Sequence, residues 1–425
     1  MAAAAGMFSS ARDRSSGAVK RPVEYSILYT ATLCTLAVGA VMVYSASSAE
    51  SLLAAGDPAT YLKRYVLFGM VGVGALFFLS RHGLALVRNA TPLLLGVGFV
   101  LTLAVSIPGA GVEVNGAKRW LGAGPLQFQP SELLKLALML YAVHILALRP
   151  KSVRSMGALA RPLLLVVGAA CAVLMTQPDM GTALVVCGSI GALLIAAGTP
   201  IRLIGTMFGG LAVLASVLAV IEPYRMARLT AFIDPFSDAG GSGFQAVQAL
   251  TAIGSGGLFG VGLGESVQKI FYLPEAHTDM ILAIIGEELG LAGIVGVVAL
   301  YGLIGYAGLR TAKAARDRYS KLLAAGLTSL ILFQASLNLF AVLGLAPLTG
   351  VPLPFISYGS TNLIVLMAAM GLLLNVAATG GVAAKAATPK LWAIDGGRGD
   401  QNRDSRGRDS RARGARSGRG GRAAG

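Results

Sequence analysis

The chain has 425 residues, of which 55% are hydrophobic and only 13% are charged, and its mean hydropathy is +0.70. Its formal net charge is +15 at pH 7. A soluble domain needs far more charged side chains to cover its surface, so this composition excludes a water-soluble globular protein and predicts an integral membrane protein. The three cysteines lie in apolar runs without paired or metal-ligand spacing, and we interpret them as packing residues.

Ten apolar segments approach the length of a membrane-spanning helix, which is about 20 residues. They are residues 26–47, 61–80, 90–107, 131–148, 162–176, 181–198, 203–221, 280–308, 322–344 and 363–380. Long runs of Leu, Val, Ala and Gly favour helices over a barrel, because backbone groups in lipid must be satisfied internally. The sequence therefore predicts an all-α, polytopic membrane domain of about ten helices over residues 26–380.

Basic residues in the short loops predict the orientation of these helices. Residues 1–25 are polar and basic, and if they form a cytoplasmic tail, the basic residues cluster at every second exit from the membrane. This is the pattern of the positive-inside rule. Both termini are then expected in the cytoplasm, and the long connection 222–278, between the seventh and eighth spans, is expected on the outer side.

The long outer connection contains the apolar, glycine-rich run GFQAVQALTAIGSGGLFGVGLG, residues 243–264. Its glycines make it a poor membrane span, so we expect a re-entrant or interfacial segment. The glycines do not form a G-x-G-x-x-G fingerprint and no strand precedes them, so a nucleotide site is not supported.

The segment 385–425 is rich in Arg, Gly, Ser and Asp and has almost no large apolar residues, so we expect a disordered cytoplasmic tail. Three roles remain open: a solvated tail that fixes the topology and touches anionic lipid, a docking site for a cytoplasmic partner, or an RNA-binding segment. Nucleic-acid binding is disfavoured, because no aromatic residues are interleaved for stacking on bases.

Two groups of charged residues lie at the outer ends of predicted spans. Glu132 and Lys135 share one face of a helix, and they form either a self-neutralising structural pair or the polar wall of an outward-facing cavity. Lys118 and Arg119 are two adjacent cations on the outer side, against the positive-inside bias, and both residue types bind phosphate. Trp120 beside them is equally explained as an interfacial belt residue.

Two aspartates begin predicted helices. Asp179 in the tight connection QPDMG either caps the following helix or serves the site. Asp279 begins a helix whose small residues Ala283, Gly286, Gly290 and Gly293 share its face, so this face is expected to point into the bundle. A carboxylate held there acquires a raised pKa, which suits a general base, although helix capping is the simpler alternative. Glu287 and Glu288 point elsewhere, and we interpret them as structural, protonated or paired in the bundle.

No Ser/His/Asp motif, H-E-x-x-H or Walker A sequence occurs in the chain. The three histidines, His82, His144 and His277, are too few and too scattered to predict a His-rich metal site. A divalent cation such as Mg or Mn, held by carboxylates, remains open.

Six motifs occur in an order that resembles the SEDS family (shape, elongation, division and sporulation). They are GAKRWL, FQPSELLKL, QPDMGTAL, GFQAVQALTAIGSGGLFGVGLGES, LPEAHTDMILAIIGEELG and VPLPFISYGST. The resemblance covers residues 25 to 380, and LPEAHTD and LPFISYG are similar to the versions of the cell-division members rather than the elongation members.

This resemblance implies a peptidoglycan glycosyltransferase that polymerises lipid II at the division septum of a bacterial cytoplasmic membrane, with release of undecaprenyl pyrophosphate. Asp279 matches the essential carboxylate, which we assign as the general base, and Arg119 and Lys135 are the candidates for the pyrophosphate. The expected partners are a class B penicillin-binding protein and other division proteins. The implied substrate-binding positions are Lys118, Arg119, Trp120, Gln129, Glu132, Lys135, Asp179, Glu275, His277, Thr278, Ser357 and Tyr358.

Three positions depart from the pattern of the family. Lys118 replaces the first arginine of RRW, Met280 replaces the phenylalanine of TDF, and Ser360 replaces the second glycine of SYGG. Because the replacements are small or soft, we expect activity to survive. Competing hypotheses are a transporter that flips lipid II, a scaffold that recruits partners through its tail, and the same polymerase chemistry in cell elongation.

Overall fold

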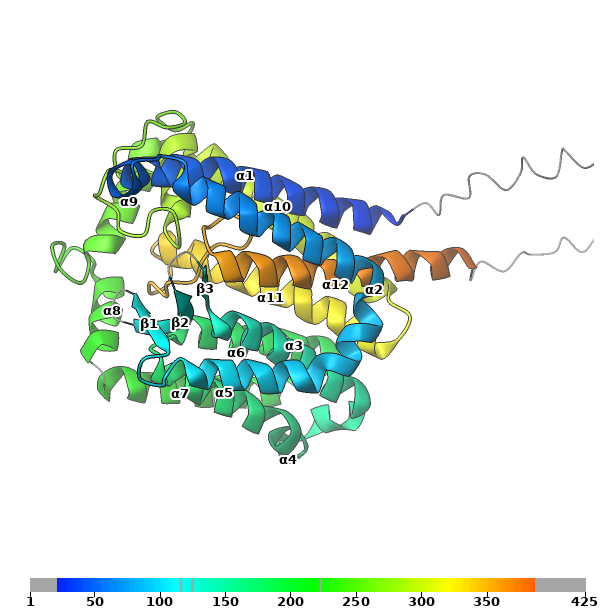
Figure 1. The fold of residues 1–425 in the computed structure, drawn as a ribbon. Helices are drawn as coiled ribbons and strands as arrows, with labels where there is room; N and C mark the ends of the chain where they lie inside the picture. The colour runs from blue at the N-terminus through cyan, green and yellow to red at the C-terminus, as the bar shows by residue number, and fades with distance from the viewer. Residues whose placement is uncertain (1–20, 115–116, 124–125, 222, 387–425) are drawn as a thin grey trace, which may run out of the picture. The chain divides into compact units, whose positions relative to one another are not determined.

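The computed structural model describes residues 21–114, 117–123, 126–221 and 223–386. In this part of the chain the helices follow one another with a small sheet after the second (Figure 1). The elements are α1 (Val23–Ala55), α2 (Thr60–Ala104), β1 (Gly111–Val114), β2 (Ala117–Ala123), β3 (Leu126–Phe128), α3 (Pro130–Leu148), a 3₁₀ turn (Pro150–Arg154), α4 (Met156–Leu159), a π-helical turn (Ala160–Leu164), α5 (Leu165–Thr176), α6 (Met180–Ala197), α7 (Ile201–Ile221), α8 (Pro223–Ile233), α9 (Phe244–Gly256), α10 (Ile281–Ala314), α11 (Arg318–Val342) and α12 (Ser360–Ala386). The predictions for residues 1–20 and for the tail from residue 387 onward lie outside the described residues.

Long apolar helices confirm the predicted polytopic membrane fold. Within the described residues, eight helices are long and apolar enough to cross a membrane. The other two predicted spans fall within α2, which covers both 61–80 and 90–107, and within α7, whose apolar stretch Ile201–Val213 is shorter. The number of ten spans therefore stays a prediction.

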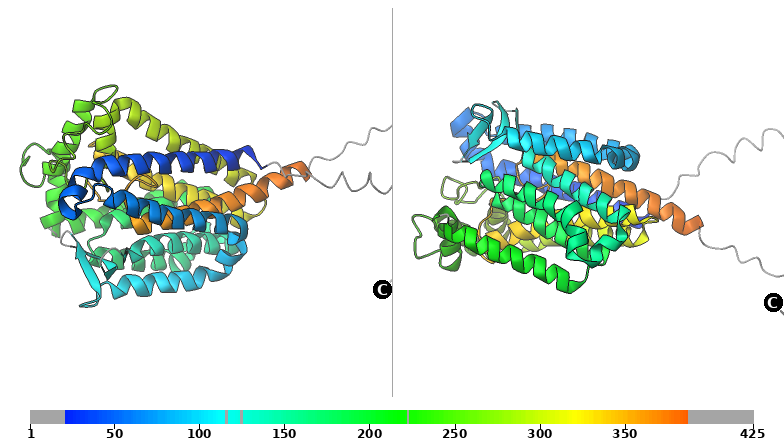
Figure 2. Two further views of the ribbon diagram at one scale, coloured as in Figure 1. Left: turned by 45° about the horizontal axis from the view of Figure 1, so that its top comes forward. Right: turned by 90° about the horizontal axis from the view of Figure 1, so that it is seen from below.

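Helix α2 has 45 residues and covers two of the predicted spans. At 1.5 Å per residue this is about 67 Å of helix in total, about twice the thickness of a hydrocarbon core, but it does not run in one direction. The ribbon turns sharply after its first part and returns, so that α2 forms two arms (Figures 1 and 2). The first arm packs against α12, where Gly72 lies against Met367.

A three-stranded antiparallel sheet occupies the segment 108–130, in the order β1-β2-β3. The sequence analysis predicted an all-α fold and did not predict these strands. The sheet is short, and its register pairs Trp120 with Val112 and Leu121 with Phe128. Its function in the fold is to carry Lys118, Arg119 and Trp120 on one strand, immediately before α3 begins.

The glycine-rich segment 243–264 packs against α10, and its re-entrant or interfacial character stays a prediction. Helix α9 packs along α10, and the following residues 257–262 bond to a broken turn of α10. Glu287 O and Glu288 O accept hydrogen bonds from Val261 N and Gly262 N at 2.9 and 3.1 Å. The break lies at Gly290, with φ 66° and ψ −163°, a conformation open essentially to glycine alone.

Two exposed apolar residues lie beside this break. Phe259 is 83% exposed and Leu258 is 65% exposed. Leu258 O accepts a hydrogen bond from Ala292 N of α10 at 3.1 Å, so the two residues are held next to the broken turn.

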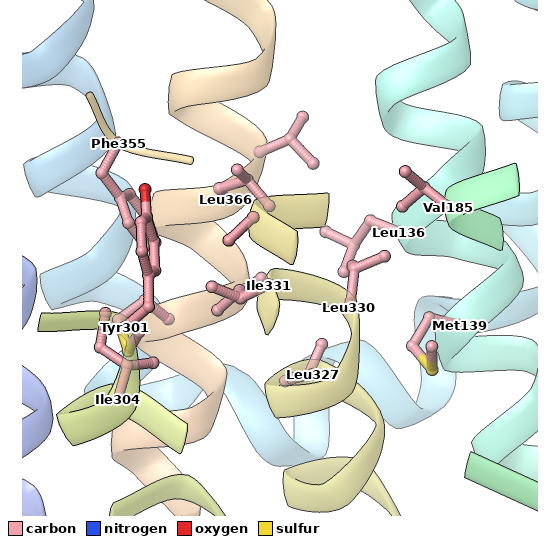
Figure 3. Packing of buried hydrophobic residues seen from close by; sticks show 14 of the residues in the cluster. Leu136, Met139, Val185, Tyr301, Ile304, Leu327, Leu330, Ile331, Phe355 and Leu366 are labelled. Carbon is pink, nitrogen blue, oxygen red and sulfur yellow. The ribbon is translucent and has the colours of Figure 1, made fainter. Parts of the chain in front are cut away.

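The interior of the bundle is built from α3, α6, α10, α11 and α12 (Figure 3). Leu136, Val185 and Leu330 lie between α3, α6 and α11, whereas Ile331 faces α12. Phe355, from the connection between α11 and α12, is buried with Tyr301 of α10. An extended segment therefore lies inside a helical membrane domain, and its backbone polar groups need partners there.

Candidate active site

Residues 343–359 connect α11 to α12, and we call them the α11–α12 connection. Because the connection is not helical, its carbonyl groups have no helical partners. Side chains from four helices donate to them instead: Arg228 (α8) to Leu348, Asn338 (α11) to Val351, Gln334 (α11) to Pro352, Tyr301 (α10) to Pro354, and Tyr65 (α2) to Phe355. These polar contacts fix the backbone of the α11–α12 connection. Several charged residues that the sequence analysis singled out lie near it.

Asp279 lies at the end of the long outer connection, directly before α10. The N-cap residue of α10 is Met280, and no side chain makes a capping hydrogen bond there. The simpler alternative, that Asp279 caps this helix, is therefore wrong. Its main-chain oxygen accepts a hydrogen bond from Asn338 Nδ2 at 2.7 Å, and a Cβ atom at Gly350 would stand 3.9 Å from its Oδ2 atom. The carboxylate therefore faces the α11–α12 connection.

The surroundings of Asp279 change its acidity. Burial, and after it the negative charge of Glu275, raise the pKa of the Asp279 carboxyl to about 7. The Thr278 hydroxyl, which donates to Asp279 Oδ1 at 3.2 Å, and the positive charge of Arg228 oppose this shift. A carboxylate with a pKa near 7 is suited to accept and release a proton at neutral pH, as a general base must.

Glu132 and Lys135 form a buried ion pair on α3. Lys135 Nζ lies 2.6 Å from Glu132 Oε2 and 2.7 Å from Gln334 Oε1, and the two charged side chains are 1% and 3% exposed. Gln334 in turn donates to Pro352 O, and Asn338, one turn further along α11, donates to Val351 O. The pair neutralises itself, as one alternative held, and it also supports the connection beside Asp279.

Arg119 and Asp179 meet at the connection between α5 and α6. Arg119 donates through Nε to Gln177 O at 3.1 Å and through its terminal nitrogen to Pro178 O. Asp179 caps α6 by accepting from Thr182 N at 3.1 Å, which confirms the capping alternative, and it also accepts from Ser131 Oγ at 3.1 Å. The contacts of Arg119 join β2 to the connection between α5 and α6, and the contact of Asp179 with Ser131 joins that connection to α3.

Lys118, next to Arg119 on β2, has a different environment. Its nearest acidic partner is Glu113 on β1, at 4.0 Å, and both side chains are more than half exposed. Such a pair contributes little stability. Lys118 and Arg119 therefore differ: Lys118 is exposed at the surface, whereas Arg119 is tied to the α5–α6 connection.

His277 lies in an aromatic cluster with Tyr61 and Tyr358. Its ring centroid is 4.4 Å from that of Tyr61 and 5.7 Å from that of Tyr358, and its Nδ1 atom is 3.4 Å from Glu50 Oε2. Burial lowers the pKa of His277, although the charges of Glu50 and Glu275 oppose this shift. The His277 carbonyl accepts from Tyr358 N at 3.0 Å, so the cluster attaches the outer connection to the α11–α12 connection.

The remaining predicted site residues have structural partners in the same region. Ser357 Oγ accepts from Leu353 N at 2.8 Å within the α11–α12 connection. Gln129 N donates to Thr361 Oγ1 at 3.0 Å, which links the start of α3 to α12. Thr278 donates to Glu275 Oε2 at 2.6 Å. Several of the predicted residues therefore lie around the α11–α12 connection, where their polar atoms hold the backbone, whereas Lys118 lies apart from it at the surface.

Glu287 and Glu288 are structural, as the sequence analysis interpreted them. Glu288 is fully buried and pairs with Lys269 Nζ at 2.8 Å, and it also accepts from Ser45 at 2.6 Å. Glu287 accepts from the Ser266 hydroxyl and from Val267 N. Two buried carboxylates thus attach residues 266–269, which follow the glycine-rich segment, to α10, and the partner cation is Lys269.

The sequence analysis missed Arg228, Gln334 and Asn338. Arg228 lines a cavity of about 660 Å³ between α8, α9 and the start of the α11–α12 connection. The signal that could have indicated Arg228 is its positive charge in a connection predicted to lie on the outer side, against the positive-inside bias. Gln334 and Asn338 were hidden because polar residues inside an apolar helix give no indication of which carbonyl they contact.

The described residues contain no group of three or more His, Cys, Asp or Glu side chains that could hold a metal ion. The divalent cation considered in the sequence analysis therefore has no assigned protein ligands in this part of the chain, and it stays a prediction.

Comparisons with known proteins agree with this arrangement. Residues 25–380 match the family model of the cell cycle proteins FtsW, RodA and SpoVE. The chain is 39% identical to stage V sporulation protein E of Bacillus subtilis over 82% of its own length and 96% of that protein. It is 42% identical to a probable peptidoglycan glycosyltransferase FtsW of Thioalkalivibrio sulfidiphilus, over 82% and 88% of the two chains.

Solved structures show the same fold. One chain of a peptidoglycan synthase complex that coordinates polymerization and crosslinking superposes with a TM-score of 0.68 and 31% identity, over 82% of this chain and 96% of that chain. The rod shape determining protein RodA of Thermus thermophilus gives a TM-score of 0.60 at 28% identity, over 85% and 98%. The chain therefore belongs to the cell cycle protein family of FtsW, RodA and SpoVE, which confirms the resemblance inferred from its motifs.

Proposed function

We infer that this protein is a peptidoglycan glycosyltransferase that joins lipid II units into glycan strands, with Asp279 as its general base. The observation that carries this proposal is the environment of Asp279, a buried carboxylate that does not cap its helix, faces the α11–α12 connection and has a pKa of about 7. The names of the relatives support the same chemistry, since several are called probable peptidoglycan glycosyltransferases.

The reaction is a single displacement at a sugar carbon. The 4-hydroxyl oxygen of the acceptor sugar attacks the anomeric carbon of the donor, and Asp279 takes the hydroxyl proton. The new glycosidic bond forms while the bond from the anomeric carbon to the diphosphate oxygen breaks, and undecaprenyl pyrophosphate leaves with the electron pair. The buried surroundings of Asp279 keep this proton transfer away from water.

A membrane position follows from the fold, and its finer details are part of the proposal. Asp279 belongs on the outer side of a bacterial cytoplasmic membrane, with both termini in the cytoplasm, because the short basic loops lie at the opposite ends of the spans. The protein acts at the division septum, with a class B penicillin-binding protein that cross-links the strands and with other division proteins. A neighbour of known structure belongs to a peptidoglycan synthase complex, which supports such a partnership.

The test compares Asp279→Asn with the wild-type protein, each purified with its partner transpeptidase and given lipid II. The amide keeps the shape of the side chain but cannot accept the proton, so we expect polymerisation to fall by at least about a hundredfold. Lipid II binding and thermal stability should be retained. Polymer formed at the wild-type rate by Asp279→Asn would refute the assignment of the base. Movement of labelled lipid II across proteoliposomes by wild-type protein, without polymer, would indicate a transporter instead.

A further inference from the structure

A second cavity, of about 270 Å³, lies at the other end of the helices from Asp279. Its wall is formed by Arg88 of α2, by three residues near the end of α3 (His144, Ala147 and Leu148), and by residues 317–319 at the start of α11. Asp279 directly precedes α10, whereas residues 317–319 follow the opposite end of that helix. The cavity is therefore separate from the candidate active site.

Arg318 is held at this cavity by a carbonyl group of α3. Leu146 O lies in the last turn of α3, and the residue four positions further is Pro150, which has no N–H to donate to it. Arg318 Nε donates to this carbonyl at 3.2 Å. In the part of the chain that the structure describes, this is the one hydrogen bond of the Arg318 side chain. Its two terminal nitrogens therefore keep their donors for another group.

Arg88 is positioned at the cavity by an aromatic ring. Its guanidinium carbon lies 5.3 Å from the centre of the Tyr319 ring, within the range of a cation–π contact, and Tyr319 is buried. This contact orients the guanidinium but does not neutralise it, because the ring carries no net charge. His144, half-buried on α3, adds at least one ring N–H donor in either of its charge states.

The charge around the cavity favours an anion. Asp317 is the acidic residue of the wall, and its Oδ2 atom is used to cap α11, where it accepts from Ser320 N at 3.1 Å. The two guanidinium groups exceed this single carboxylate, so the wall has a net positive charge. The neighbouring chain strengthens this field, since residues 313–321 contain four basic residues and Asp317 as their only acidic one.

The cavity lies where predicted spans end. Arg88 falls between the predicted spans 61–80 and 90–107, the span 131–148 ends at Leu148, and the span 322–344 begins shortly after Tyr319. Basic pockets between transmembrane helices on the cytoplasmic side are typical sites for lipid head groups. Leu148 is 59% exposed, so an apolar surface for an acyl chain lies directly beside the charged groups.

We propose that this cavity binds the phosphate of an anionic phospholipid on the cytoplasmic side of the membrane, with Arg88 and Arg318 contacting its oxygens. A guanidinium presents parallel N–H donors that match phosphate oxygens, so two of them can hold one phosphate from two sides. The acyl chains run along the exposed surface beside Leu148. This lipid site is independent of the proposed glycan synthesis, because it lies at the opposite end of α10 from Asp279.

The test measures binding of phosphatidylglycerol to the full-length protein in detergent by native mass spectrometry. We expect the double variant Arg88→Gln/Arg318→Gln to bind at least about tenfold more weakly, since hydrogen bonds to a charged group are lost. Arg88→Lys/Arg318→Lys keeps both charges and should lose less. The matched control is Arg81→Gln/Arg316→Gln, which removes two exposed basic charges close to the same positions but outside the wall, and it should bind as the wild-type protein does.

A second variant tests the cavity without changing its charge. Ala147 is partly buried and lines the wall, so Ala147→Phe places a ring in the space that the head group needs. We expect weaker binding of phosphatidylglycerol with little change in thermal unfolding. This variant decides the question if the double arginine variant does not fold.

Two further probes identify the source of the phosphate. Phosphatidylethanolamine has the same phosphate but no net charge, and it should bind the wild-type protein several-fold more weakly than phosphatidylglycerol does. Inorganic phosphate lacks acyl chains and should not displace phosphatidylglycerol at equal concentration.

Three results would overturn the proposal. The first is wild-type affinity in Arg88→Gln/Arg318→Gln or, where that variant does not fold, in Ala147→Phe. The second is an equal loss in the control variant Arg81→Gln/Arg316→Gln, because general surface charge and not the cavity would then attract the lipid. The third is equal binding of phosphatidylethanolamine or full displacement by inorganic phosphate, since the site would then select no anionic lipid.

Discussion

The acidity of Asp279 makes the pH dependence of polymerisation a direct test of its role. A general base works only when it is ionised, so the rate should rise with pH as the carboxyl loses its proton. With a pKa of about 7, about one tenth of the molecules are ionised at pH 6 and about nine tenths at pH 8. We therefore expect a rate about tenfold higher at pH 8 than at pH 6, and a further tenfold loss for each unit below pH 6.

The charges that face Asp279 determine the pH at which the polymerisation rate rises. Glu275 raises the pKa of Asp279, and Arg228 of α8 lowers it. Glu275→Gln removes a negative charge but keeps an oxygen that can accept the Thr278 hydrogen bond. The pKa of Asp279 should therefore fall, and the rise in rate should move to lower pH.

The assay is the initial rate of glycan formation from labelled lipid II between pH 5.5 and 8.5, with the partner present. Glu265→Gln is the matched control, because Glu265 is an exposed carboxylate on the same outer connection and should leave the profile unchanged. A rate that is flat between pH 5.5 and 8 would refute the assignment of Asp279 as a base with a raised pKa. An equal shift in Glu275→Gln and Glu265→Gln would show that general loop charge, and not Glu275, acts on it.

Two further predictions concern the contacts between α10 and the long connection before it. Lys269→Met leaves Glu288 buried without its cation, so the free energy of unfolding should fall by about 3–5 kcal/mol. Adding Glu288→Gln should recover part of this loss, and an unchanged melting temperature in Lys269→Met would contradict the pairing. Gly290→Ala forces a side chain into a glycine conformation and against Gly260, which should cost at least about 1–3 kcal/mol, whereas Gly296→Ala, with open space at its Cβ position, should be nearly neutral. Equal stability of the two glycine variants would show that the break at Gly290 is not required.

The membrane architecture could be read from the sequence because lipid allows few solutions. Apolar runs of about 20 residues can satisfy their backbone groups only as helices, so the spans follow from composition alone. A re-entrant or interfacial segment at residues 243–264 was predicted on the same grounds, because glycine-rich apolar runs are poor spans. The three short strands in 108–130 were missed, since pairing over so few residues leaves a weak pattern in the sequence.

The sequence singled out Asp279 as a candidate general base, but it did not show the environment of this carboxylate. A helix start with a carboxylate predicts capping equally well, and only the structure shows Met280 as the N-cap residue. In the same way, Asp179 does cap its helix, although both aspartates precede apolar helices in the sequence. Capping depends on where the side chain points, and that is fixed by tertiary contacts.

The sequence by itself determined that this protein is a helical membrane protein, and it singled out the Asp279 carboxylate as a candidate site residue. It could do so because periodicity, hydropathy and motifs are local properties of the chain. Only the tertiary structure decided which charges are already paired. The Glu132–Lys135 pair follows from helix spacing, whereas Lys269 is neutralised by Glu288, which only the fold brings to it. Arg228 lies 51 residues before Asp279 and acts on it only because the α11–α12 connection, from a third part of the chain, lies between them.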